Sequence, residues 1–144
     1  LRKLGGTERD IEGKLLKIVP DVIGLSPQEL PESAKRVSTA LAKEQSGAQR
    51  ETALLKDEIG RFFERTQKEA YGRVSREIAE TNAPAELEKV RAQISANIAM
   101  EAAKNLNGWS KRFAAWADVP AGELVRHGAS SWLARALRPS PHLS

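Results

Sequence analysis

The strongest pattern in the sequence is a stripe of apolar residues at helical spacing between residues 48 and 78. Its members recur at intervals of three, four or seven positions without an intervening proline: Leu55, Ile59, Phe62 or Phe63, Ala70, Val74 and Ile78. Opposite charges flank the stripe at helical spacing, as in the pair Glu64 and Lys68. Thr66 and Gln67 interrupt the stripe, as a stutter does in a coiled coil. The pattern predicts one long amphipathic helix.

A second long stripe follows the segment Thr81-Asn82-Ala83-Pro84. This segment predicts a turn, because proline and the residue before it resist helical continuation. The apolar positions beyond it are Leu87, Val90, Ile94, Ile98, Ala102, Leu106, Trp109, Phe113 and Trp116. Two long helices joined by so short a turn are expected to lie antiparallel. We therefore predict an all-α fold whose main body is a long, coiled-coil-like antiparallel helical hairpin.

Two shorter helices are expected before the hairpin. The first is predicted to begin near Thr7, where a hydroxyl cap precedes a carboxylate by three residues, and to end at Pro20. In the connector, Ser26-Pro27-Gln28-Glu29 has the pattern of a capping box with proline at the first helical position. The second helix is predicted from Glu32 to about Gln45, where Ser46-Gly47 breaks or bends it. These boundaries divide the chain into an N-terminal helix and connector (residues 1–31), a hairpin body (32–118) and a C-terminal segment (119–144).

The C-terminal segment differs from the rest of the chain in composition. It contains both histidines and three of the seven prolines, and it lacks Lys, Ile, Asn, Gln and Asp. We expect a short helix there followed by a partly disordered tail. A frameshift in the encoding gene near Asp118 is the alternative, in which case the tail is not native. The chain also begins with Leu1 and has Met100 as its only methionine, so we expect a processed, excised or incomplete chain.

Composition and charge argue for a soluble helical protein without an active site. The sequence has no cysteine, which excludes disulfides and thiolate metal sites, and its two histidines lie fifteen positions apart. No nucleophile motif or phosphate-binding loop is present, so we predict a non-enzymatic protein without metal, cofactor or small-molecule substrate. We expect the protein in the cytoplasm, either free or associated with a membrane. The net charge is +4, and residues 91–144, with seven basic and three acidic side chains, account for all of it.

Three hypotheses for function follow from these patterns. The first is a scaffold or interaction protein that self-associates, or binds another protein, through its amphipathic helices; its predicted interface comprises Leu55, Ile59, Phe62, Phe63, Val74, Ile78, Ile94 and Ile98. The second is a nucleic-acid-associated accessory protein, with Lys104, Lys111 and Arg112 as phosphate contacts. The third is a membrane-surface adaptor, in which Trp109, Phe113 and Trp116 lie at the level of the lipid headgroups.

The charged, alanine-rich stretches 53–78 and 85–105 resemble small accessory proteins of plasmid conjugation operons. Those proteins pair a charged helical body with a C-terminal apolar anchor. The resemblance implies an accessory or regulatory role in conjugation for this chain. The apolar anchor is the part of the pattern that this sequence does not show.

Overall fold

The computed structural model describes residues 1–119, and all regular secondary structure in that part is helical, which confirms the predicted all-α class. The elements are α1 (Arg2–Val22), the short 3-10 helix η1 (Pro27–Glu29), α2 (Glu32–Thr66), α3 (Glu69–Glu80), α4 (Ala83–Ser95) and α5 (Ala99–Asp118). The predicted short helix and tail after Asp118 lie outside the described residues, apart from Val119.

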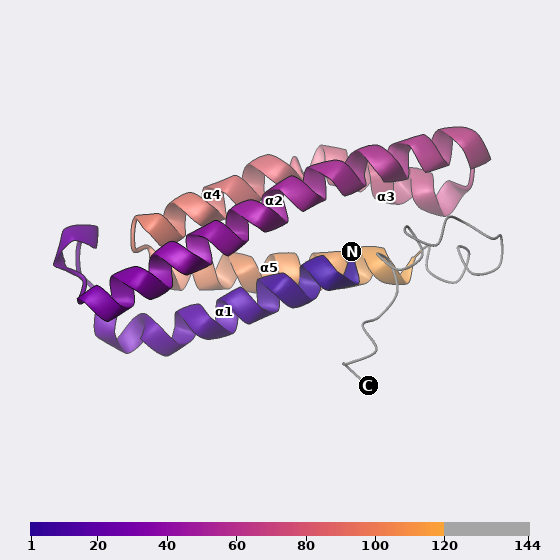
Figure 1. Cartoon of the computed structure of the whole chain (residues 1–144). Helices are drawn as coiled ribbons and strands as arrows, with labels where there is room; N and C mark the ends of the chain where they lie inside the picture. The colour runs from indigo at the N-terminus through magenta and orange to yellow at the C-terminus, as the bar shows by residue number, and fades with distance from the viewer. Residues whose placement is uncertain (120–144) are drawn as a thin grey trace.

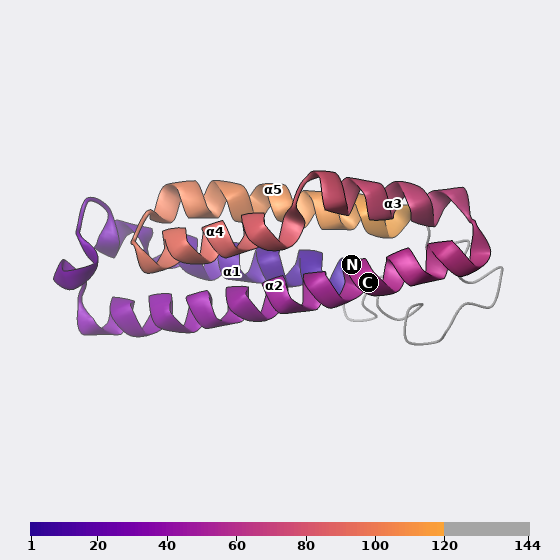
Figure 2. The ribbon, with the colours of Figure 1, turned by 90° about the horizontal axis from the view of Figure 1, so that it is seen from above.

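The helices form four rods that alternate in direction (Figures 1 and 2). α1 is the first rod, α2 the second, α3 and α4 follow one another along the third, and α5 is the fourth. The most extensive contact between helices joins α1 to α5, and the next joins α2 to α4. Smaller contacts of α1 with α2 and of α4 with α5 complete the arrangement. The structure is thus an up-and-down bundle in which each rod buries its apolar face against its neighbours.

α1 is longer than the sequence predicts at both ends. It begins at Arg2, so Gly5, Gly6 and Thr7 are inside the helix, and the Thr7 hydroxyl donates to the Lys3 carbonyl instead of capping the helix. A β-carbon on Gly5 would lie 3.1 Å from the carbonyl oxygen of Ser110 in α5. α1 and α5 therefore approach closely along this turn. Pro20 does not stop the helix either, because in the last turn a missing amide donor costs only one intrahelical bond.

The predicted long helix over residues 48–78 is divided by a reversal of the chain. α2 ends at Thr66, and Gln67 adopts a left-handed conformation with φ 55°. The Thr66 hydroxyl and the Gln67 side-chain amide both bond to carbonyls of the last turn, at Phe62 and Glu64. Side-chain bonds of this kind compete with helical continuation. The polar interruption of the stripe is thus a turn and not a stutter.

The predicted hairpin turn at residues 81–84 also differs in the structure. Asn82, at φ 53°, breaks the third rod between α3 and α4, but the chain continues in the same general direction (Figures 1 and 2). The reversal occurs later, at residues 96–98, where Asn97 has φ 58°. The arrangement is therefore a four-rod bundle and not one long hairpin, and α1 belongs to the same bundle as the predicted body. The capping box at Ser26 is confirmed: its backbone N–H donates to Glu29 Oε1 at 2.9 Å.

Candidate interaction surface

The predicted oligomer interface is mostly buried inside the chain itself. Fully or nearly fully buried members are Leu55, Ile59, Phe62, Val74, Ile78 and Ile94. Phe63 is partly buried against the core, with its ring over Gly72 of α3. Ile98 alone of this set is exposed. The two stripes thus meet other helices of the same bundle.

The predicted membrane contacts are buried as well. Trp109, Phe113 and Trp116 form a cluster of three rings on α5, with centroids 5.7 to 6.2 Å apart. The indole Nε1 of Trp116 donates to Glu77 Oε2 of α3 at 2.7 Å. Edge contacts between rings of this kind stabilise a core beyond the area that they bury. A membrane contact through these rings would require the bundle to open.

The predicted phosphate contacts lie on the outer face of α5. Lys104, Lys111 and Arg112 are all exposed, and the Arg112 guanidinium lies 4.9 Å from the centroid of the Trp109 ring. Lys111 and Arg112 also line a shallow groove of about 580 Å³ between α3 and α5, together with Arg73. Glu77 and Glu80 line the same groove, so its three cations are partly balanced.

An apolar patch of which the sequence predicted only one member, Ile98, lies at the end of the bundle opposite this groove. We call it the end patch; it comprises four exposed side chains, Leu16, Ile23, Ile98 and Met100. Between 43% and 64% of each residue is accessible to solvent. Leu16 lies in α1 and Ile23 directly follows its last residue, while Ile98 and Met100 flank the start of α5. The end of α1, η1 and the α4–α5 turn meet at this end (Figure 1).

Asn97 joins the two halves of the end patch. Its side-chain Nδ2 donates to the carbonyl oxygens of Val22 and Leu25, both at 2.8 Å. Its left-handed backbone turns the chain from α4 into α5, a conformation that asparagine tolerates better than most residues. One side chain therefore holds the α4–α5 turn against the end of α1 and places Ile98 beside the segment that carries Ile23.

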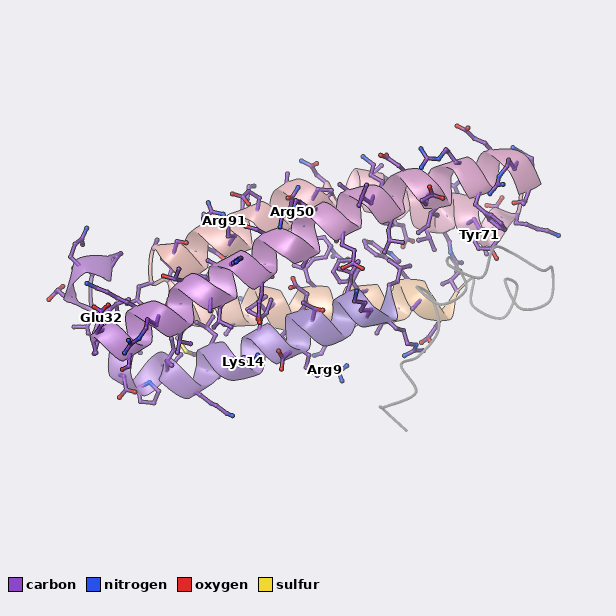
Figure 3. The ribbon with its side chains drawn as sticks, in the orientation of Figure 1. Arg9, Lys14, Glu32, Arg50, Tyr71 and Arg91 are labelled. Atoms are coloured by element: carbon purple, nitrogen blue, oxygen red, sulfur yellow. The ribbon has the colours of Figure 1, made fainter. Side chains whose placement is uncertain are left out.

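Charges around the end patch are balanced. Lys17 and Asp21 accompany the apolar residues of α1, and Glu101 and Lys104 accompany those of α5. All four are exposed, and none makes an ion pair with another described residue. By contrast, Lys14 pairs with Asp10 and Glu44 farther back along the bundle. Charged side chains elsewhere, among them Arg9 and Arg50, project from the outside of the rods (Figure 3).

A polar pair lies in the middle of the core. Glu8 of α1 and Gln45 of α2 are both fully buried, and Gln45 Nε2 donates to Glu8 Oε1 at 3.0 Å and to the Leu87 carbonyl of α4 at 3.3 Å. Burial raises the pKa of Glu8 to about 7, although the hydrogen bond from Gln45 acts in the opposite direction. The pair thus links three helices.

The sequence carries a signal for the burial of this pair. Glu8 falls between Leu4 and Ile11 on the apolar face of α1, and Gln45 falls between Leu41 and Ala48 on that of α2. A polar residue on an apolar stripe at helical spacing indicates burial. The end patch had no comparable signal, because exposed apolar residues are common at protein surfaces.

Two kinds of site can be assessed within the described residues. No group of three or more His, Asp and Glu side chains in residues 1–119 lies close enough together to hold a metal ion. None of the helices in this part of the chain has a stretch that is long and apolar enough to cross a lipid bilayer. Comparison of the chain with known protein families, curated proteins and solved structures finds no match.

Proposed function

We propose that this protein is a non-enzymatic helical interaction module that binds a second copy of itself through the end patch. The observation that carries the proposal is the grouping of four exposed apolar side chains at one end of a bundle whose other large apolar residues are, with few exceptions, buried. Within residues 1–119, Leu54 of α2 is the one other large apolar residue exposed to a similar degree. Exposed apolar groups that gather within a polar rim are typical of protein interaction sites.

The surrounding charges favour a second copy over a polyanion as the occupant. The four charged side chains on the end-patch segments are of both signs, and Glu29 of η1 is also exposed at this end, so no concentrated positive charge attracts a phosphate backbone or an anionic membrane. In a two-fold contact each copy presents the same surface, so Lys17 of one copy can meet Asp21 or Glu101 of the other. Such a rim is complementary to itself.

The size of the end patch sets the expected strength of the contact. A stable dimer buries about 800 Å² on each partner, which is more than four side chains supply. The contact therefore belongs at the small end of protein interfaces. We expect a reversible equilibrium between monomer and dimer that depends on protein concentration.

Sedimentation velocity over a concentration series tests the proposal. The unaltered chain should gain mass with concentration, and the double variant Ile23→Lys with Met100→Lys should stay monomeric. Leu54→Lys is the matched control, because Leu54 is 66% exposed and lies about 30 Å along α2 from its start. Circular dichroism establishes that each variant keeps its helices. A strictly monomeric unaltered chain, or an equal loss of association in the control, would rule the proposal out.

The groove between α3 and α5 favours nucleic acid as the second candidate. It brings Arg73 of α3 beside Lys111 and Arg112 of α5, and none of the three forms an ion pair with another described residue. A shift of duplex DNA that weakens steeply with salt, and that Lys111→Ala with Arg112→Ala abolishes, would favour this candidate. Lys14→Ala with Lys17→Ala on α1 provides a control of equal charge.

A further inference from the structure

Three buried side-chain atoms in the described residues lack a hydrogen-bond partner: Arg2 Nε, Glu8 Oε2 and Gln45 Oε1. The two acceptors among them, Glu8 Oε2 and Gln45 Oε1, belong to the same pair. If Glu8 is ionised, both atoms are acceptors, and neither can satisfy the other. The remaining atoms of the same two groups, Glu8 Oε1 and Gln45 Nε2, already form a hydrogen bond at 3.0 Å. Buried polar atoms are nearly always hydrogen-bonded, so two unpaired acceptors in one pair need an explanation.

A single proton on the Glu8 carboxyl explains both unpaired acceptors. A neutral carboxylic acid has an O–H donor, whereas a carboxylate has none. With the proton on Oε2, Glu8 donates to Gln45 Oε1 while it accepts from Gln45 Nε2, and the acid and the amide form a closed pair with two hydrogen bonds. We propose that Glu8 is held as a neutral carboxylic acid in the folded bundle, and that this proton is a pH-sensitive element joining α1 to α2 and α4.

The surroundings of Glu8 contain no charge that would favour ionisation. α2 presents the uncharged amide of Gln45, and α4 presents the carbonyl of Leu87 through the same amide. The charged side chains of α5, among them Lys104 and Lys111, are exposed on its outer face, and no charge acts on Glu8 strongly enough to count among the causes of its shifted pKa. Glu12, one turn farther along α1, is only partly buried and accepts from Asn107 Nδ2 at 3.5 Å. An ionised Glu8 would be a buried charge without a partner.

Loss of the proton should loosen the contacts of α1. Ionisation removes the donor from the acid–amide pair and leaves a charge among apolar side chains, which the bundle can solvate only by opening. A departure of α1 from the bundle would also remove Leu16 and Ile23 from the end patch. The inference concerns the core, however, and does not depend on the proposed self-association.

Carbon-13 NMR of the side-chain carboxyls in the unaltered full chain tests the proposal without a variant. Glu8 should titrate near pH 7, well above the ordinary value of 4.5 for a glutamate, and infrared difference spectra against Glu8→Gln should show a neutral carboxylic acid at pH 6. A Glu8 resonance that titrates at the ordinary value would overturn the proposal.

Urea unfolding at a series of pH values gives a second, independent result. The ratio of the unfolding equilibrium constant of the unaltered chain to that of Glu8→Gln should rise by roughly two orders of magnitude between pH 4.5 and pH 8, since each unit of pKa shift is a factor of ten. Glu8→Gln keeps two hydrogen-bonding atoms at this position without an ionisable proton, and the buried Leu1 amino group, which also titrates in this range, is common to both proteins. Glu12→Gln should keep the pH dependence of the unaltered chain. An equal pH dependence in Glu8→Gln and the unaltered chain would contradict the proposal.

Discussion

The α-carbon of Gly5 faces the backbone of Ser110 so closely that a β-carbon there would lie 3.1 Å from the Ser110 carbonyl oxygen and 3.4 Å from the β-carbon of Phe113. Neither atom is the end of a flexible side chain, so the two helices would have to move apart. Gly6, the next residue, has nothing within 4 Å of the same position. One glycine is therefore required by helix packing and its neighbour is not.

Gly5 and Gly6 provide a matched test of the contact between α1 and α5. Gly5→Ala should lower the free energy of unfolding by about 1 kcal/mol or more, because overpacking outweighs the gain in helix propensity. Gly6→Ala should leave it unchanged or raise it by up to about 1 kcal/mol. Chemical denaturation monitored by circular dichroism measures both. Equal effects of the two changes would mean that α1 and α5 do not meet at Gly5.

Adjacent leucines on α2 test whether the predicted interface stripe is internal core. Leu55 is 4% exposed and Leu54 is 66% exposed. Leu55→Ala should cost roughly 2–5 kcal/mol of stability, at any protein concentration, because it leaves a cavity inside one chain. Leu54→Ala should change the stability by less than about 0.5 kcal/mol. If the stripe joined two copies instead, the effect of Leu55→Ala on the thermal midpoint would depend on concentration.

Asn97 offers a test of the turn that builds the end patch. Asn97→Ala removes two hydrogen bonds to the end of α1 and leaves at φ 58° a residue that tolerates the left-handed region less well than asparagine, so we expect a loss of roughly 2–3 kcal/mol. Asn97→Gly removes the same bonds without the backbone strain and should cost about 1 kcal/mol less than Asn97→Ala. Thermal unfolding of the three proteins measures the difference. Identical midpoints for the two variants would contradict a left-handed conformation at this position.

The dependence of stability on pH follows from the buried carboxyl of α1. The folded chain keeps the proton on Glu8 up to a pKa of about 7, whereas an unfolded chain releases it near the ordinary value of 4.5. Between these values the folded state binds more protons, so the free energy of unfolding falls as pH rises. The expected loss is roughly 3 kcal/mol in total, complete a little above pH 7.

The carboxyl of Glu29 changes the stability of the fold in a lower pH range. The pKa of Glu29 is lowered by the hydrogen bond from the Ser26 backbone, so its contribution is present above the ordinary value and is lost as pH falls below it. The two effects act in opposite directions and on opposite sides of pH 4.5. The buried amino group of Leu1, whose pKa burial lowers to about 5, raises stability with pH over part of the range from pH 4.5 to 8. Calorimetry of the unaltered chain and Glu8→Gln over this range therefore isolates Glu8 as the difference between the two. Equal changes of the two midpoints with pH would contradict the assignment.

The sequence by itself determined the helical class and the apolar face of each helix. Leu55, Ile59, Val74 and Ile78 were predicted from their spacing to be apolar-face positions of one helix. All four are buried, although they lie on two helices, α2 and α3. The capping box at Ser26 was also predicted correctly. These features depend on residues within a few positions of each other, so local rules of helix geometry and capping are sufficient to predict them.

Only the tertiary structure decided what covers each apolar face and where the chain reverses. A stripe shows that a helix buries one side, but the same stripe suits a core within one chain and an interface between two chains. The reversals at Gln67 and Asn97 depend on left-handed residues whose side chains bond to nearby and distant carbonyls. The proline at position 84 looked like the stronger signal for a reversal, yet the chain passes it in the same general direction. The direction of a helix after a break is set by the packing of the rods, which involves residues far apart in the sequence, and local patterns do not contain it.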